Sequence, residues 1–242
     1  YEPDPRHVQL LVQAFGFDGK TKAVATPGEK KNDYHNEDLL DKADHTFYRS
    51  CTMRLAFLAQ DLPVLQYPAN KVARKMSTPT VGAMQRLKRV ARYLIGHGRW
   101  VQRFEEQDPT SILRVYTDSD WAADLTDRKS VSCVAVMLGS HCIKCKVSTQ
   151  KSPATSSGEA EYVAMTMGGS IGLGIKSLAG DFKRDLMVHL HTDSSSAKGT
   201  ASRIGLGQIR HLDVALLWVQ HHVQQKRFVL KKIPGAGNPA DI

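Results

Sequence analysis

The chain has 242 residues, of which 41% are hydrophobic, and it carries a formal net charge of +9. This is enough for one large or two modest domains with a hydrophobic core. No signal peptide or membrane-spanning run is visible, which argues against a secreted or membrane protein. The four cysteines then fit a reduced intracellular compartment, either a cytoplasmic particle or the nucleus. The basic charge alone indicates a polyanionic partner only weakly, because many soluble proteins are basic.

Residues 1–108 are predicted to form a mainly helical segment. Apolar residues recur at helical spacing in three places, whereas residues 16–44 are polar and rich in Lys, Asp and Gly, which is typical of a long loop. Pro63 and Pro68 are expected to break the chain. The three predicted helices cover residues 5–15, 45–59 and 80–95.

The basic residues are concentrated in one stretch, residues 71–103, which contains nine Lys or Arg and no Asp or Glu. A solvated helix face would normally mix both signs of charge. We therefore favour a surface that contacts phosphates over a merely solvated basic face. Within the amphipathic helix of residues 80–95, the basic side chains that lie mostly outside the apolar stripe are Arg86, Lys88, Arg89 and Arg92.

The pattern changes after Pro109, and residues 109–242 predict an α/β domain. Apolar and polar residues alternate in the first strand, as they do in a strand with one buried face. The second half of the helix of residues 157–179 contains four Gly, each of which costs roughly 1 kcal/mol relative to Ala, so we expect that half to be weak or broken. The predicted strands cover residues 113–118, 131–138, 143–149, 187–192 and 228–233, and the helices cover 157–179, 195–202 and 211–225.

Four acidic residues of this second part lie where their carboxylates could meet. Asp118 ends the first strand and Asp193 ends the fourth, so the two converge if those strands are neighbours. Glu159 and Glu161 are about 200° apart around a helix, so only one can face the sheet. The small or flexible residues on the face of Glu161 favour Glu161 for a close approach to the sheet. Asp241, at the start of a last helix, could close the cage from the side.

Carboxylates this close would repel one another and raise their own pKa values unless cations occupied the gap. Mg²⁺ prefers oxygen ligands, and two such ions about 3.5–4 Å apart can activate a water and stabilise the leaving oxygen of a phosphodiester. Taken singly, an Asp at a strand end is most often a turn former or a helix cap. Turn formation or helix capping is a much weaker explanation for four acids in this order. We therefore predict that the four carboxylates form a cage for divalent metal.

Short motifs surround these acids. They read YTDSDWA at 116–122, DRKS at 127–130, SSGEAEYVA at 156–164, DS at 193–194, RHLDV at 210–214 and NPADI at 238–242. Together they resemble the ribonuclease H domain of copia-type LTR retrotransposon polyproteins. Upstream, the motifs YRS at 48–50, LAFLAQ at 55–60 and LKRVARYL at 87–94 resemble the segment that joins reverse transcriptase to ribonuclease H in the same polyproteins.

The resemblance implies a ribonuclease H-like α/β fold, with a mixed five-stranded sheet, its first three strands antiparallel, and helices on both faces. It implies hydrolysis of the RNA strand of an RNA–DNA hybrid with two Mg²⁺ or Mn²⁺ ions, in a polyprotein whose reverse transcriptase lies upstream. No membrane is expected, and the oligomeric state is left open. The acids that match the metal-binding positions of the family are Asp118, Glu161, Asp193 and Asp241.

Residues beside these acids are expected to contact a hybrid through its backbone and 2′-hydroxyls rather than its sequence. They are Ser119, Ser157 and Ser194. His211 and Asp213 also match a family motif, but the sequence assigns them no physical role.

Several features depart from the family pattern. The loop before Asp241 has no His, and the chain begins at Tyr1 and stops one residue after Asp241, so both ends look cut. We therefore expect a ribonuclease H-like domain truncated at its C-terminus. An alternative is a catalytically inactive, nucleic-acid-binding remnant. A strand transferase of the integrase type would need the order Asp, Asp, Glu, whereas Glu161 precedes Asp193.

Cys142 and Cys145 look like half of a zinc site, but no second pair follows them. They lie in a predicted strand, where positions i and i+3 point to opposite faces. The sequence therefore favours plain buried or edge thiols over a zinc site.

Overall fold

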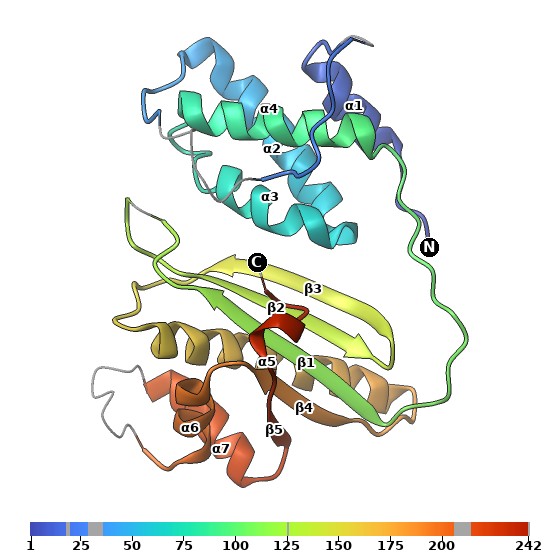
Figure 1. The fold of residues 1–242 in the computed structure, drawn as a ribbon, viewed down its shortest axis with the longest axis vertical. Coiled ribbons are helices and arrows are strands. Elements are labelled where there is room, and N and C mark those ends of the chain that lie inside the picture. Colours follow the sequence, from blue (N-terminus) through green and yellow to red (C-terminus); the bar gives the residue numbers. More distant parts are fainter. Residues whose placement is uncertain (18–19, 29–35, 125, 206–213, 242) are drawn as a thin grey trace. The chain divides into compact units, whose positions relative to one another are not determined.

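The computed structural model describes residues 1–17, 20–28, 36–124, 126–205 and 214–241 (Figure 1). The chain divides into two compact units, Tyr1–Phe104 and Glu105–Ile242, and each is described by itself. The sequence placed this boundary between residues 108 and 109.

The first unit is helical around a single core, as the sequence predicts. Its helices are α1 (Arg6–Ala14), α2 (Lys42–Asp61), α3 (Gln66–Ala73) and α4 (Val81–Gly96), with a 3₁₀ turn, η1, at Pro63–Leu65. Helix α4 begins at Thr80, whose side chain accepts a hydrogen bond from the Ala83 N–H. The fully buried residues of this core include Leu11, Tyr48, Leu55, Leu65, Leu87 and Val90.

The expectation that Pro68 breaks the chain is wrong. Pro68 lies in the first turn of α3, where a backbone N–H has no partner inside the helix, so proline is tolerated there. Pro63 is likewise the first residue of the 3₁₀ turn η1, so it starts a short helical turn and does not merely follow the end of α2. The prolines therefore mark where short helices start, and the sequence missed α3 for this reason.

The second unit contains one five-stranded mixed sheet in the order β3-β2-β1-β4-β5. The strands are β1 (Ile112–Asp120), β2 (Val131–Leu138), β3 (His141–Thr149), β4 (Met187–Thr192) and β5 (Phe228–Lys232). Strands β1, β2 and β3 pair antiparallel, whereas β4 is parallel to β1 and β5 is parallel to β4. This connectivity is the ribonuclease H-like fold, so the predicted fold class is confirmed.

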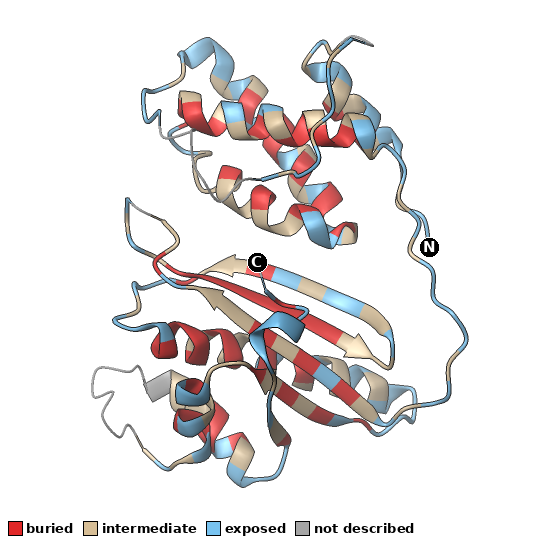
Figure 2. Ribbon diagram, in the orientation of Figure 1, coloured by how far each residue is buried: buried red, intermediate tan, exposed pale blue. Residues whose placement is uncertain are grey.

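The helices of this unit are α5 (Ser157–Asp181), α6 (Ser195–Ser202) and α7 (Trp218–Gln224), with 3₁₀ turns η2 (Val214–Leu217) and η3 (Gly235–Gly237). Residues 211–213 of the predicted helix 211–225 lie outside the described residues, and the described part starts as a 3₁₀ turn. The three α-helices share one core with one face of the sheet, and β2 is buried along most of its length (Figure 2). Among the described residues of this unit, no α-helix provides the cover that the resemblance implies for the other face.

The prediction that α5 is broken in its second half is wrong, because the helix runs without a break from Ser157 to Asp181. Gly168 and Gly172 face the sheet where side chains would not fit. A Cβ added at Gly168 would collide with Thr117, and one added at Gly172 would lie 2.9 Å from a methyl of Val115. Glycine lowers the helix propensity of α5, but it also lets the helix pack closer to the sheet, and this packing offsets the loss.

A β-bulge in β3 corrects the prediction about the cysteine pair. Cys145 pairs with Ala135 and Lys144 with Val136, but Cys142 then pairs with Met137, so Ile143 is an extra residue. Residues that pair directly across two strands lie on the same face, as do residues two apart on one strand. Cys142 and Cys145 therefore point to one face and not to opposite faces.

The glycine packing leads to a matched pair of substitutions in α5. We predict that Gly168→Ala lowers the free energy of unfolding by about 1–3 kcal/mol, because the new methyl overpacks a stiff, β-branched neighbour. Gly174→Ala should raise it by up to about 1 kcal/mol, because nothing lies within 4 Å of that position and Ala is the better helix former. Urea unfolding of the full chain measures both, and equal effects would contradict this account of the packing.

Candidate metal centre

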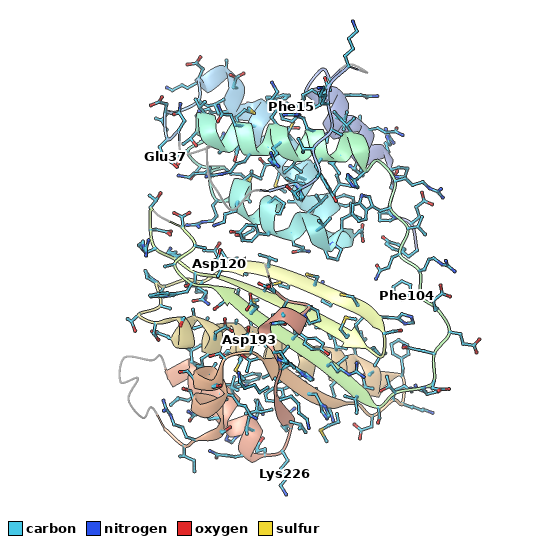
Figure 3. All side chains as sticks on the ribbon, in the orientation of Figure 1. Phe15, Glu37, Phe104, Asp120, Asp193 and Lys226 are labelled. Carbon is cyan, nitrogen blue, oxygen red and sulfur yellow. The ribbon has the colours of Figure 1, made fainter. Side chains whose placement is uncertain are left out.

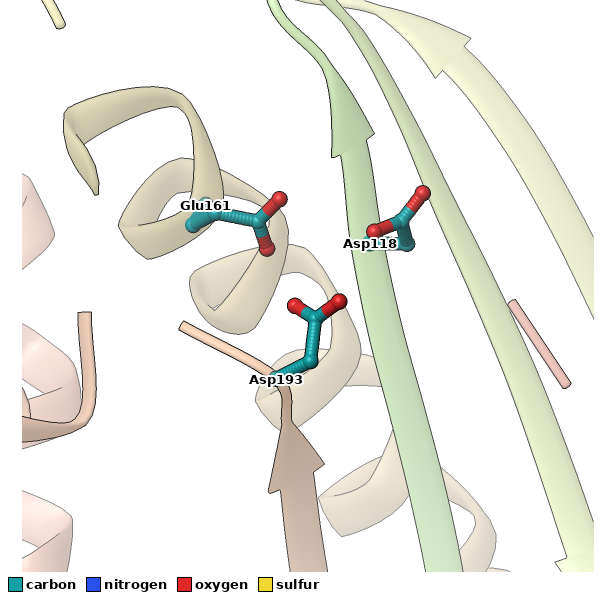
Figure 4. A group of neighbouring side chains, drawn as sticks. All are labelled: Asp118, Glu161 and Asp193. Carbon is teal, nitrogen blue, oxygen red and sulfur yellow. The ribbon is translucent and has the colours of Figure 1, made fainter. Parts of the chain in front are cut away.

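Three of the four predicted acids meet above the end of the sheet. Asp118 lies near the end of β1. Asp193 directly follows β4, which is the parallel neighbour of β1 (Figure 3). Glu161 projects from the second turn of α5 toward both (Figure 4). One ligand oxygen from each of the three lies within 4.8 Å of the others, and this is the only such group in the described part of the chain.

The two glutamates of α5 have separate roles, set by how the helix begins. The Ser156 Oγ accepts a hydrogen bond from the Glu159 N–H at 3.2 Å. The Glu159 carboxylate accepts in return from the N–H and the hydroxyl of Thr155, both at 2.8 Å. This pattern resembles a capping box, except that the glutamate accepts from Thr155, the residue before the N-cap Ser156. Glu159 is therefore used at the helix start, and Glu161 is the glutamate that reaches the other acids.

Ser119 holds the Glu161 carboxylate in place. Its backbone N–H and its hydroxyl both donate to Glu161 Oε1, each at 3.0 Å. The other oxygen, Glu161 Oε2, is buried and has no hydrogen-bond partner among the described residues. A buried carboxylate oxygen without a partner is costly, so this atom points to a ligand at the centre of the group.

Burial and repulsion from neighbouring carboxylates disfavour the charged forms of Asp118 and Glu161. Burial, followed by the nearby Asp193 and Asp241, raises the pKa of Asp118 to about 6. Burial, followed by Asp118, raises the pKa of Glu161 to about 7, although the Ser119 hydrogen bonds act in the opposite direction. A divalent cation between the acids would reverse this repulsion.

The donor set fits the metal that the resemblance implies. Mg²⁺ and Mn²⁺ take oxygen ligands and are commonly bound through a few carboxylates, with waters completing the shell. Asp118, Glu161 and Asp193 would hold such an ion, and the unpartnered Glu161 Oε2 supplies a free ligand atom.

Asp241 lies near this group but outside it. Its charge contributes to the raised pKa of Asp118, yet its own side chain is exposed. The segment that carries it is fastened to β1 by Asn238, whose side-chain N–H donates to the Thr117 carbonyl at 3.1 Å. Asn238 also accepts from the Ala240 N–H through its side chain and from the Asp241 N–H through its carbonyl. Asp241 as a fourth ligand thus stays a prediction.

The serines predicted to contact nucleic acid have different surroundings. The Ser119 hydroxyl is already engaged with Glu161, and the Ser194 hydroxyl caps α6 by accepting from the Ala197 N–H at 3.1 Å. Ser157 is exposed in the first turn of α5. A nucleic-acid contact for these serines stays a prediction. His211 and Asp213 lie outside the described residues.

The predicted basic helix surface belongs to the other unit. There, Arg89 donates to the Thr26 hydroxyl at 3.1 Å and Arg92 donates to the Lys22 carbonyl at 3.0 Å, so both fasten the segment before α2. Lys88 is exposed and Arg86 is partly buried. A phosphate-contacting role for the four basic residues stays a prediction.

Two residues that position the site were not assigned that role from the sequence. Ser119 was expected to contact nucleic acid, and Asn238 was given no role. The Ser-x-x-Glu spacing of Ser156 and Glu159 is a capping-box signal that would have separated Glu159 from Glu161 directly. No comparable local signal marks Asn238, because its partner, Thr117, is far away along the chain.

Comparison with known proteins places the chain among transposon polyproteins. It is 38% identical over 122 residues to the retrovirus-related Pol polyprotein from transposon RE1 of Arabidopsis thaliana, a match that covers 49% of this chain and 8% of the relative. It is also 38% identical over 146 residues to that from transposon RE2 of the same plant, which covers 58% of this chain and 10% of the relative. The chain thus spans about a tenth of the length of these relatives. No protein-family model matches it.

Among solved structures, the chain is similar to LC11-RNase H1, isolated from compost. That likeness has a TM-score of 0.44 at 15% identity, and covers 55% of this chain and 91% of that one.

The sheet connectivity and the acidic group at the strand ends define a protein with the ribonuclease H-like fold. In sequence, the chain is similar to a short part of the retrovirus-related Pol polyproteins from transposons. None of the helices in the described residues is long and apolar enough to cross a membrane.

The contacts of Ser119 predict that it supports metal binding. Ser119→Ala removes one of the two donors to Glu161 Oε1, and a hydrogen bond to a charged group contributes about 1.5–3 kcal/mol. We expect the affinity for Mn²⁺, measured by isothermal titration calorimetry, to fall by at least roughly tenfold. Ser152→Ala, at an exposed position, is the control and should bind as the wild type does. Equal affinity in both variants would show that the Ser119 hydroxyl does not position the ligand.

The raised pKa values predict how stability depends on pH without metal. Below a pH of about 4, Asp118 and Glu161 are neutral in both the folded and unfolded chains. Their folded-state pKa values are about 6 and about 7, so the unfolded chain loses its protons first as the pH rises. Their contribution to stability is therefore present below about pH 4 and is lost as the pH rises through 6 and 7.

This dependence is measured as the melting temperature in EDTA between pH 4 and pH 8, for the wild type and for Glu161→Gln. The wild type should lose stability relative to the variant across that window, and Mg²⁺ should restore the wild type most strongly at the upper end. Parallel curves for the two proteins would contradict the assignment.

Proposed function

We propose that this chain is a divalent-metal-dependent ribonuclease H that hydrolyses the RNA strand of RNA–DNA hybrids as part of a retrotransposon Pol polyprotein. The observation that carries the proposal is the convergence of Asp118, Glu161 and Asp193, with one buried carboxylate oxygen left without a partner. Sequence similarity to retrovirus-related Pol polyproteins from transposons supports the same proposal.

The reaction would take place where the three carboxylates meet. Two bound Mg²⁺ or Mn²⁺ ions would activate a water and stabilise the leaving oxygen of the phosphodiester. Asp118, Glu161 and Asp193 would bind the metal, and Ser119 fixes the Glu161 carboxylate so that its free oxygen stays directed at the other acids. Binding metal requires the ionised carboxylates, so loading releases the protons that the raised pKa values would otherwise retain.

The substrate and the partners follow from the same proposal. A hybrid would be recognised through its backbone and its 2′-hydroxyls, which makes the activity independent of sequence. The remainder of the polyprotein, with the reverse transcriptase upstream, would deliver the hybrid. The basic residues of α4 are candidates for contacts with its phosphates.

The test is cleavage of a labelled RNA–DNA hybrid with Mg²⁺ by the wild type and by Asp193→Asn. We expect metal-dependent cleavage of the RNA strand by the wild type, and a loss of at least about 100-fold in the variant, because the substitution removes a charged ligand of the metal. Double-stranded DNA of the same sequence should remain intact.

Two further measurements complete this test. The variant should melt no lower than the wild type in EDTA, because it removes one of the repelling charges, so that a loss of cleavage reflects the site and not the fold. Hybrid binding with a steep salt dependence, but with no cleavage at any metal concentration, would contradict the nuclease and identify the chain as a binding remnant.

A further inference from the structure

Three of the four cysteines lie on one face of the antiparallel half of the sheet. Cys133 and Ala135 are two apart on β2, and Ala135 pairs with Cys145 of β3. Cys142 lies on the same face because the bulge at Ile143 lets it pair with Met137, which is two residues from Ala135 on β2. The sequence predicted no such grouping, because an unbulged strand would have separated Cys142 from Cys145.

Two of these thiols touch. The Cys133 thiol donates a hydrogen bond to the Cys145 sulfur, which lowers the pKa of Cys145 and raises that of Cys133. The positive charge of Lys144 and the N–H of Lys146 also lower the pKa of Cys145. Cys145 is only partly buried, whereas Cys133 is buried. The partly buried Cys145 is thus the better nucleophile, and the buried Cys133 lies beside it.

The arrangement fits a thiol pair better than a metal cage. The described residues contain one group of three or more potential ligands close enough to hold an ion, and that group consists of the carboxylates. Cys142 therefore does not form a three-thiol metal site with Cys133 and Cys145. An accessible, activated cysteine beside a second thiol is the usual setting of a redox-sensitive cysteine.

We propose that Cys145 and Cys133 form an oxidation-sensitive dithiol, in which Cys145 reacts with a peroxide and Cys133 resolves the product to an intrachain disulfide. The inference does not depend on the proposed nuclease activity.

The chemistry balances with one equivalent of hydrogen peroxide. The Cys145 thiolate attacks one peroxide oxygen, the O–O bond breaks, and the departing hydroxide takes up a proton, which leaves a sulfenic acid on Cys145. The Cys133 sulfur then attacks the Cys145 sulfur, the S–O bond breaks, and water leaves with the Cys133 proton. Two thiols are oxidised to one disulfide while the peroxide is reduced to two waters.

The position of the pair in the sheet makes this bond possible and reversible. Diagonal neighbours on antiparallel strands have Cα atoms about 7–8 Å apart, slightly beyond the usual span of a disulfide. β3 is an edge strand and is bulged beside Cys145, so it can shift toward β2. A disulfide formed under such a constraint is readily reduced.

The bond would also form next to the candidate metal centre. Cys133 pairs directly with Asp118 across β2 and β1, so it lies on the same face as that carboxylate.

The test is peroxide treatment of the full chain, followed by disulfide mapping of peptides under non-reducing conditions. We expect a peptide linked through Cys133 and Cys145, a loss of two hydrogen atoms from the intact mass, and full reversal by dithiothreitol. Cys142→Ser is the matched control and should form the same link, since Cys142 takes no part. In Cys145→Ser no link should form.

Cys133→Ser separates the two chemical steps. Without its resolving partner, Cys145 should accumulate as a sulfenic acid that dimedone traps, while the buried Cys51 stays unmodified. A disulfide that includes Cys142, a link between two chains, or oxidation of Cys51 at the same rate as Cys145 would overturn the proposal. Absence of any thiol oxidation in the wild type would overturn it equally.

Discussion

The candidate metal centre depends on a fold that keeps three carboxylates close together although they repel one another. Burial and like charges raise the pKa values of Asp118 and Glu161 to about 6 and about 7, so their ionised forms are disfavoured without a cation. The fold nevertheless brings them within ligand distance of one another and of Asp193. A group that is unfavourable by itself and is favoured by a divalent ion is what a metal-dependent site requires.

This constraint is met mainly by backbone geometry. The parallel pairing of β1 with β4 places the ends of both strands at the same edge of the sheet, which brings Asp118 to Asp193. Helix α5 supplies the third acid, and its glycines let it approach β1 closely enough for Glu161 to reach them. Ser119 then fixes the rotamer of Glu161 through two hydrogen bonds.

The second unit also illustrates how one sheet can carry two kinds of chemistry. Asp118 and Cys133 pair across β1 and β2 and therefore share a face, while α5, α6 and α7 cover the other face. Hard carboxylate oxygens gather at the edge where β1 and β4 end, and soft sulfur atoms gather between β2 and β3. The two sets lie close enough for the charge of Asp118 to raise the pKa of Cys133.

Much of this architecture could be predicted from the sequence, because it depends on local patterns. Alternating strands, the hairpin between β2 and β3, and the order of acids at strand ends all follow from periodicity and motif, and β4 and α6 have the predicted bounds. The convergence of Asp118 and Asp193 was predicted on the condition that their strands are neighbours, and they are.

The features that the sequence missed depend on contacts between distant residues or on small irregularities of the backbone. The continuity of α5 follows from how its glycines pack on Thr117 and Val115, which helix propensity does not describe. The common face of Cys142 and Cys145 follows from one extra residue, Ile143, which no local signal marks. Glu161 was chosen correctly as the glutamate nearest the other acids, but the capping role of Glu159 was not recognised.

The central claim is that the three carboxylates form one metal site, and a crystal structure of the chain grown with Mn²⁺ tests it most directly. Anomalous scattering would locate the metal without relying on activity. We predict a manganese peak coordinated by oxygens of Asp118, Glu161 and Asp193, with Glu161 Oε2 among its ligands. A structure at neutral pH with saturating Mn²⁺ and no metal between these residues, or with their carboxylates turned apart, would contradict the account.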